Sequence, residues 1–186
     1  MPSADPRPLL GEPVSLDLLN TRWMSQGSLQ DLLTSADGLR VWLGSNSLTG
    51  LLQDTPEGIE ATLNALLSAR EALAAAVDSP GDPDAARRVD AVLAHGRLRA
   101  TLTPEGPSET AEFDDPAWGP AWTAAYDYLR LLRTAPDRIH ACAHQDCVLH
   151  FFDTSRNGTR RWCSMAGCGN RAKASRHYAR SRDEHS

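Results

Sequence analysis

The four cysteines of the chain have the spacing of a structural zinc site. Cys142 and Cys147 form one close pair, Cys163 and Cys168 form a second, and 15 residues separate the two pairs. Each pair can hold one edge of a tetrahedral ion through a tight backbone turn, and thiolate sulfur binds Zn²⁺ at about 2.3 Å. Four thiolates also fill the coordination shell, so this zinc would stabilise the fold and leave no open position for catalysis.

Two other uses of these cysteines remain open from the sequence. Two disulfides would require an oxidising compartment, and the start of the chain shows no basic and apolar export signal. A histidine could replace one cysteine ligand, because His140, His144 and His150 are close in sequence. We favour four cysteine ligands, since paired spacing of this kind is a strong zinc motif.

The residues that must position the cysteines predict a hairpin followed by a helix. Val148–Phe152 is apolar and β-prone, Asn157-Gly158 is a turn signal, and Thr159–Trp162 can return as the second strand. After Cys168, Gly169-Asn170 can begin a helix that continues through Arg171–Arg182. A cysteine knuckle, a hairpin and a helix around one metal would form a treble-clef-like zinc finger.

Charge is divided unevenly along the chain. The net charge of the whole chain is -5, but residues 1–137 carry −10 and residues 138–182 carry +7. The asymmetry predicts an anionic partner for the C-terminal segment. Two alternatives are that the basic segment docks on the acidic part of its own chain, or that its helix is a solvated charged surface.

Basic and polar side chains near the cysteines are candidates for contact with nucleic acid. In the predicted helix, Lys173, Arg176 and Arg180 share one face at about 100° per residue. Such a ridge suits phosphate binding or entry into a DNA major groove. The thiolate charge could instead be offset by the arginines that flank cysteines, which are Arg160, Arg161 and Arg171. The candidates are Arg156, Asn157, Arg160, Arg161, Arg171, Lys173, Arg176 and Arg180.

The preceding region, residues 15–136, predicts a mainly helical domain. A capping residue directly precedes a proline at Thr55-Pro56, Asp82-Pro83 and Asp115-Pro116, which is a helix-start signal. Residues 36–43 predict a shorter helix that begins after a capping serine. The segment 16–21 could be either a short helix or the end of a strand.

A β-hairpin and two terminal segments complete the predicted organisation. Arg97–Thr103 and Glu109–Phe113 flank a turn rich in proline and glycine, which predicts a short hairpin. Residues 1–14 contain four prolines and predict a flexible arm, and residues 183–186 form a tail. We therefore expect an α+β protein, with the mainly helical domain followed by a small treble-clef-like zinc finger over residues 137–182.

Other functional classes have little support in the sequence. There is no Gly-x-Ser-x-Gly elbow, no P-loop and no dinucleotide-binding motif, so we expect no enzyme. No apolar run is long enough to span a bilayer, and we expect a cytoplasmic protein. Asp17, Asn20 and Thr21 could line a ligand pocket, although a local hydrogen-bonded turn would use the same residues.

The run Cys168-Gly169-Asn170-Arg171 resembles the CGNR zinc finger family. Asp153–Gly158 and Arg161-Trp162-Cys163 support the resemblance, which extends over residues 140–182. Residues 15–135 resemble the ABATE domain that precedes this finger, mainly through Leu16-Asp17-Leu18-Leu19-Asn20-Thr21. In that motif, Leu19 stands where a β-branched residue is common.

This resemblance implies zinc at the four cysteines and double-stranded DNA at the basic positions, because the family is described as one of stress-induced transcription regulators. We therefore expect a DNA-binding regulator whose N-terminal domain senses a small-molecule effector or mediates assembly. The oligomeric state stays open, a dimer included. The alternative is a zinc-stabilised module that binds another protein and does not bind DNA.

Overall fold

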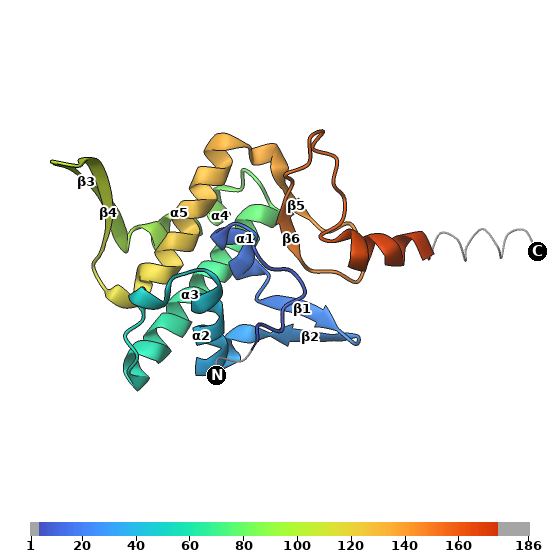
Figure 1. Cartoon of the computed structure of the whole chain (residues 1–186), viewed down its shortest axis with the longest axis horizontal. Helices are drawn as coiled ribbons and strands as arrows, with labels where there is room; N and C mark the ends of the chain where they lie inside the picture. Colours follow the sequence, from blue (N-terminus) through green and yellow to red (C-terminus); the bar gives the residue numbers. More distant parts are fainter. Residues whose placement is uncertain (1–3, 175–186) are drawn as a thin grey trace, which may run out of the picture.

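The computed structural model describes residues 4–174, which form a helical body and a small C-terminal finger (Figure 1). We call residues 4–135 the body and residues 136–174 the finger. The described part contains helices and three separate two-stranded antiparallel sheets. The predicted α+β class is confirmed. In the described range, no helix is both long and apolar enough to cross a membrane.

Helix α3 (Pro56–Asp78) packs against the other main helices of the body and begins where the sequence predicts. The Thr55 hydroxyl accepts a hydrogen bond from the first turn, and proline occupies the first helical position. Helix α4 (Pro83–Leu93) begins in the same way, with the Asp82 carboxylate as the cap. Both predicted starts are confirmed, because a capping side chain and a proline act within a single turn.

Helix α5 (Gly119–Thr134) begins slightly later than predicted. The Asp115-Pro116 signal first opens a 3₁₀ turn, η3 (Pro116–Trp118), in which the Asp115 carboxylate accepts a hydrogen bond from the Ala117 amide at 2.9 Å. The regular helix then follows from Gly119. The capping signal therefore marks the start of helical backbone correctly, but not the type of the first turn.

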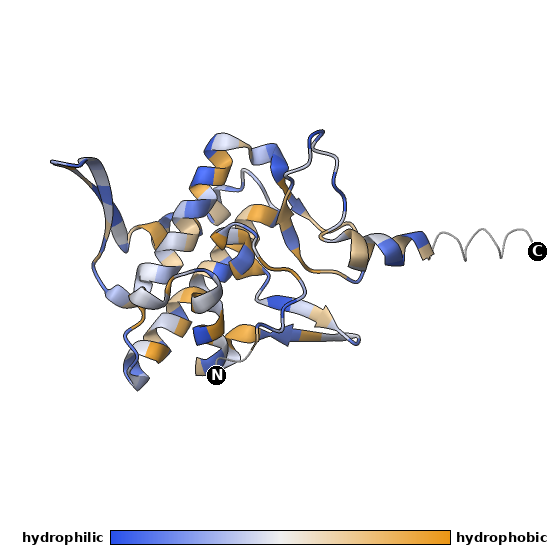
Figure 2. Ribbon diagram, viewed as in Figure 1, coloured by the Kyte–Doolittle hydropathy of each residue, from blue (hydrophilic) through white to orange (hydrophobic). Residues whose placement is uncertain are grey.

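Helix α2 (Ala36–Ser45) confirms the prediction for residues 36–43, with the Ser35 side chain as its cap. A short turn, η2 (Thr49–Leu51), connects it towards α3. The fully buried Trp42 projects from α2 into the core of the body. Figure 2 shows hydrophobic residues on the helix faces that meet inside the body and hydrophilic residues on their outer faces.

The motif segment 16–21 folds mainly as a helix, α1 (Val14–Leu19). A hairpin that the sequence analysis missed follows it, formed by β1 (Arg22–Ser25) and β2 (Ser28–Asp31). Its turn, Gln26-Gly27, has positive φ at both residues, which suits a two-residue hairpin. The next turn, η1 (Leu32–Thr34), leads into α2.

The predicted hairpin is confirmed as β3 (Gly96–Thr103) paired with β4 (Gly106–Phe113). It projects from the body at the end opposite the finger (Figure 1). Its base is anchored by Phe113, whose ring makes an edge contact with the buried Trp122 of α5 at 5.7 Å between centroids. The rest of the hairpin extends beyond the helices.

Residues 4–13 pack on the body, although their prolines predict a flexible arm. The Arg7 side chain is fully buried between two carboxylates, at 2.7 Å from Asp5 and 2.6 Å from Asp17. Leu9 packs against the apolar residues of the finger. A buried guanidinium needs paired carboxylates, and these contacts hold this segment against the body.

Candidate metal centre

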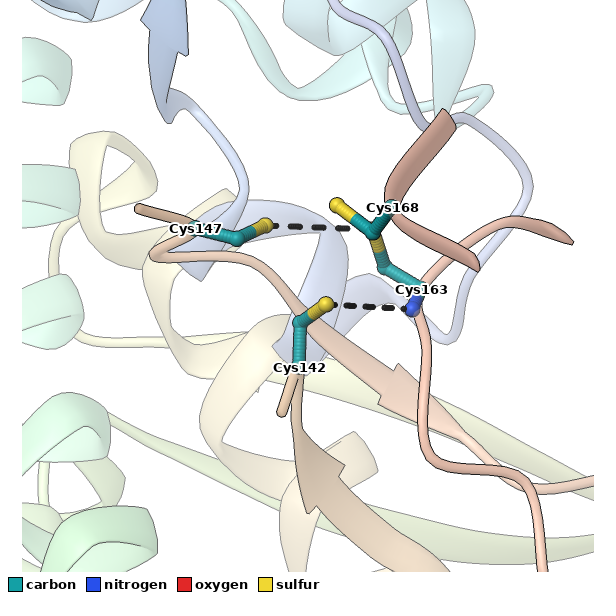
Figure 3. A group of neighbouring side chains, drawn as sticks. All are labelled: Cys142, Cys147, Cys163 and Cys168. Carbon is teal, nitrogen blue, oxygen red and sulfur yellow. Dashed lines mark hydrogen bonds between the residues drawn. The ribbon is translucent and has the colours of Figure 1, made fainter. Parts of the chain in front are cut away.

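The four cysteine side chains point towards one another (Figure 3). All four Sγ atoms lie within 4.8 Å of one another, and none of the cysteines forms a disulfide. The Sγ atom of Cys163 lies 3.8 Å from that of Cys147 and 3.6 Å from that of Cys168. Tetrahedral zinc with Zn–S bonds of about 2.3 Å requires sulfurs about 3.8 Å apart. The cluster therefore fits one zinc ion.

The histidines near the cluster have other neighbours. The His144 Nδ1 atom accepts a hydrogen bond from the Asp146 amide at 3.2 Å, and the His150 Nε2 atom lies 3.6 Å from the Asp78 carboxylate. His140 packs on an aromatic ring of the finger. Among the described residues, the group able to hold a metal consists of the four cysteines.

Strands β5 (Ile139–Ala141) and β6 (His150–Phe152) position the first cysteine pair. Cys142 directly follows β5, and its amide donates a 2.8 Å hydrogen bond to the Leu149 carbonyl across the hairpin. The Cys147 amide donates to a carbonyl three residues earlier at 3.0 Å, which makes a tight turn. This hairpin therefore brings the Cys142 and Cys147 sulfurs to within 4.8 Å of each other.

The strand pairing predicted inside the finger is wrong. The sequence predicts Thr159–Trp162 as the partner of β6, but β6 pairs with β5, which comes before the first cysteine pair. Residues 159–162 run as a loop, and the Ala143 amide donates to the Arg161 carbonyl at 2.9 Å. The finger still contains the expected knuckle, hairpin and helical turn, with the first cysteine pair inside the hairpin.

A buried carboxylate shapes the loop between the cysteine pairs. Asp153 accepts hydrogen bonds from the amides of Ser155 at 2.8 Å and Arg160 at 2.9 Å. The hydrogen bonds with Ser155 lower the pKa of Asp153 to about 2. Gly158 takes a φ of +64°, as the predicted Asn157-Gly158 turn requires. These contacts bend the loop back to Cys163 without a second strand.

The second cysteine pair lies around a π-helical turn, η5 (Met165–Gly169). Cys163 precedes the turn, and its amide donates to the Cys142 Sγ atom at 3.4 Å. The Ser164 hydroxyl caps the turn, which contains the buried Cys168. The π-helical turn continues directly into α-helical backbone over residues 170–174. Helical backbone therefore begins at Met165, earlier than the predicted start at Gly169-Asn170.

The sulfurs strongly influence one another's ionisation. The hydrogen-bond contact with Cys163 lowers the pKa of the Cys147 thiol to about 5, while the same contact raises the pKa of Cys163. Burial raises the pKa of Cys168. Crowded sulfurs cannot all carry negative charge without a cation, so loading of a divalent metal would release the remaining protons.

Two of the candidate DNA-contacting arginines lie against the cysteine cluster. The Arg160 Nε atom donates to the Trp162 carbonyl at 2.9 Å, its Nη2 atom reaches the Cys163 carbonyl, and its guanidinium lies over an aromatic ring. The Arg171 Nη2 atom donates to the Cys168 Sγ atom at 3.0 Å. This contact raises the pKa of Arg171, because the guanidinium stabilises the sulfur's negative charge.

Other candidates on the finger are open to solvent. Arg161 lies over the ring of Trp162, at 5.2 Å from its centroid. The positions of Arg176 and Arg180 lie outside the described residues, so the predicted basic ridge is described only at its first turn. The exposed candidates are Arg156, Asn157, Arg161, Arg171 and Lys173, although Arg171 also contacts the cluster.

Asp17 and Thr21, predicted as ligand-binding residues, are buried and bonded within the protein. Asp17 accepts hydrogen bonds from Arg7 at 2.6 Å and Asn46 at 2.9 Å. The Thr21 hydroxyl donates to a carbonyl of α1 and accepts a 2.8 Å bond from Arg70. In this structure both side chains connect segments of the body that are distant in sequence, and the bond from Thr21 to α1 is the local one that the turn alternative anticipates.

Asn20, the third predicted ligand-binding residue, connects the body to the finger. Its amide donates to the His150 carbonyl and accepts from the His150 amide, both at 2.8 Å, as a neighbouring strand would. The Glu12 carboxylate accepts a hydrogen bond from the Phe152 amide at 2.8 Å. Sequence reasoning missed this docking, because each contact joins residues more than a hundred positions apart.

Comparison with known families confirms the resemblance and the order of its parts. Residues 12–135 match the ABATE family, whose description is putative stress-induced transcription regulator. Residues 138–181 match the CGNR zinc finger. Both are regulator or zinc-finger families rather than enzyme families. A comparison with curated proteins gives no match.

Proposed function

Because this chain belongs to the ABATE family and continues into a CGNR zinc finger, we propose that it regulates transcription by binding double-stranded DNA through the finger. The single observation that carries the proposal is the cysteine cluster in a finger that exposes basic side chains, on a chain that is otherwise acidic. DNA presents a dense row of negative phosphates, which such a surface would attract.

Zinc would have a structural role in this function. When bound, Zn²⁺ supplies a closed tetrahedral link between the two cysteine pairs and leaves no position for substrate. The proposed ligands lie in two separate parts of the finger, the β5–β6 connection and the segment around η5. These are Cys142, Cys147, Cys163 and Cys168. Linking the two parts would fix the exposed basic side chains in one arrangement.

The basic residues would divide into two groups. Arg160 and Arg171 would support the loaded cluster, since their guanidinium groups already bond to its loops and sulfur. The exposed side chains of Arg156, Arg161 and Lys173 would contact phosphates, and Asn157 would add polar contacts at the turn. Zinc with four thiolates carries a formal −2, which leaves about +5 on residues 138–182.

The first test is the salt dependence of DNA binding. Fluorescence anisotropy would follow the zinc-loaded chain on duplex DNA over a range of KCl concentrations. If ~4–6 phosphates are contacted, the slope of log K against log salt should be about −3.6 to −5.4. Absence of binding to any duplex, or binding that salt does not affect, would contradict the proposal.

Substitution of exposed arginines tests which surface binds. The double variant R156A/R161A should bind DNA more weakly, with a salt slope shallower by about 1 for each lost phosphate contact. The matched control is R88A, which removes an exposed arginine from α4 in the acidic body. Equal loss in both variants would indicate nonspecific attraction. A stable complex with an acidic protein and no retention on DNA would support the protein-interaction alternative.

The body would position the finger and mediate assembly. Asn20 and Glu12 hold β6 through backbone hydrogen bonds, so the orientation of the finger would depend on the body. The sensing of a small-molecule effector by the body stays a prediction. A change in DNA affinity on addition of a metabolite pool would support it.

A further inference from the structure

The β3–β4 hairpin has an open outer edge on β3. The register pairs Thr103 with Gly106, and the Asp114 amide donates to the His95 carbonyl at 3.1 Å at the base of the hairpin. Antiparallel pairs alternate between hydrogen-bonded and non-hydrogen-bonded, so the even-numbered residues of β3 direct their N–H and C=O groups outward. In the described part of the chain, β4 is the only strand paired with β3.

The two edges of the hairpin differ in their capacity to accept another strand. On β4, Pro107 has no N–H to donate, and Glu109 places a carboxylate at the centre of the strand. Proline and charge are features that protect sheet edges from pairing. In the middle of β3, the residues whose backbone groups face outward are Leu98, Ala100 and Leu102. None of these three is a proline or carries a charge.

The two faces of β3 also differ. Arg97 and Arg99 lie on one face and are paired with Glu112 of β4, at 2.8 and 3.3 Å. Leu98, Ala100 and Leu102 lie on the other face, and Leu102 is 86% exposed near the tip. An isolated two-stranded hairpin is only marginally stable in water, and this one exposes the apolar side chains of Ala100 and Leu102.

We propose that β3 pairs antiparallel with β3 of a second copy of this chain, with the two-fold axis at Ala100. In this register, Leu98 lies opposite Leu102 of the second copy, and the outward-facing backbone groups of both strands meet. Arg97 and Arg99 lie opposite Thr103 and Thr101 of the second copy, so no charge faces a like charge. The product is a four-stranded sheet in the order β4–β3–β3–β4.

The sequence of β3 favours this register over its neighbour. Moving the axis by one residue towards the N-terminus, to Arg99, would place the two copies of Arg99 directly opposite each other, which is destabilising. It would also replace the Leu98–Leu102 contacts with Leu98–Ala100 contacts. A self-complementary strand with one open edge therefore points to a second copy of the chain, in an isologous contact.

Sedimentation velocity of the full zinc-loaded chain over a range of concentrations tests this pairing. Wild type should show a concentration-dependent equilibrium between monomer and dimer. A100P removes the central outward N–H of β3 and should be monomeric at concentrations where wild type is dimeric. E109P removes an outward N–H from β4 instead and should dimerise like wild type. A monomeric wild type, or equal behaviour of the two proline variants, would overturn the proposal.

A charge exchange keeps the test independent of any general effect of proline on folding. The variant L98K/L102K should be monomeric, and so should L98E/L102E, because each places like charges opposite each other across the two-fold axis. Mixing the two variants should restore a dimer, since lysine then lies opposite glutamate at both positions. Circular dichroism would verify that each variant is folded. A mixture that stays monomeric while both variants are folded would contradict the register.

Discussion

Arg171 lies beside the cysteine cluster, where a basic residue can serve the metal instead of DNA. Its guanidinium is 3.0 Å from the Cys168 sulfur, and Cys168 itself is 2% exposed. Hydrogen bonds to a metal-bound thiolate reduce its charge and orient it, and loss of such partners commonly weakens metal binding. The family motif therefore combines a proposed ligand, Cys168, with a residue that would support that ligand.

Replacing this arginine should weaken zinc binding. R171M keeps much of the aliphatic length but removes the N–H donor, so zinc affinity should fall about 10- to 100-fold. Competition with a chromophoric chelator would measure the affinity. The matched control is K173M, two residues along on the exposed surface, which should leave zinc affinity unchanged. Equal affinities in the two variants would contradict a supporting role for Arg171.

The sequence predicts the role of a residue well where that role depends on residue type and spacing. It predicts the role less well where it depends on a partner that is distant in the sequence. The four cysteines are recognised by spacing alone, and the structure brings them together. Arg160 is predicted either to contact DNA or to offset the thiolate charge, because it is basic, near a turn and close to a cysteine. The sequence does not show that its side chain reaches carbonyls of the cysteine loop, because that contact depends on how residues 153–163 fold back.

At the scale of elements, one buried ion pair joins the β1–β2 hairpin to α3. Arg70 of α3 donates to both oxygens of Asp31, at 2.7 and 2.8 Å, and its side chain is only 4% exposed. Burial by itself would raise the pKa of Asp31, but the hydrogen bonds from Arg70 and Arg22 hold it below its usual value of 3.8. The charged form of Asp31 therefore stabilises the fold.

The stability of the body should depend on this pair and on pH. D31N should lower the free energy of unfolding by about 3 kcal/mol at neutral pH, because it leaves a buried guanidinium without its counter-charge. The folded-state pKa of Asp31 is depressed, so the difference from wild type should be complete above about pH 4 and shrink as the pH falls further. Denaturant unfolding followed by circular dichroism would measure the free energy of unfolding of both proteins. A difference between D31N and wild type that grows in acid would contradict a depressed pKa of Asp31.

Helices were predicted more accurately than strand pairings for a physical reason. Caps such as Thr55, Ser35 and Asp82 act within one turn, so local sequence is sufficient to find them. The β1–β2 hairpin was missed, and the partner of β6 was wrong. The turn of the missed hairpin, Gln26-Gly27, is not one of the strongest hairpin signals, and β6 pairs with the strand that precedes it across the Cys142–Cys147 connection instead of with the segment that follows it.

At the scale of the whole molecule, the finger and the body share an apolar interior. Leu9 of the N-terminal segment and Trp23 of β1 pack against the buried residues of the finger. Phe152 of the finger packs in turn against the core of the body. Asn20, fully buried, pairs with the edge of β6. The finger is therefore held in one orientation on the helical body.

Removal of the Asn20 side chain should loosen the finger without removing its metal. N20A leaves the amide and carbonyl of His150 without their partner, at a cost of about 1–3 kcal/mol. Hydrogen exchange should become faster over His150–Phe152, while zinc content stays at one per chain. N64A, on the exposed surface of α3, is the matched control. Unchanged exchange in N20A would indicate that other contacts hold the finger.

X-ray absorption at the zinc edge of the purified, reduced chain tests the proposed metal centre most directly. The structure predicts one zinc per chain with four sulfur neighbours at about 2.3 Å and no nitrogen or oxygen in the first shell. A histidine nitrogen among the neighbours, fewer than four sulfurs, or no zinc in unchelated protein would contradict the four-cysteine finger.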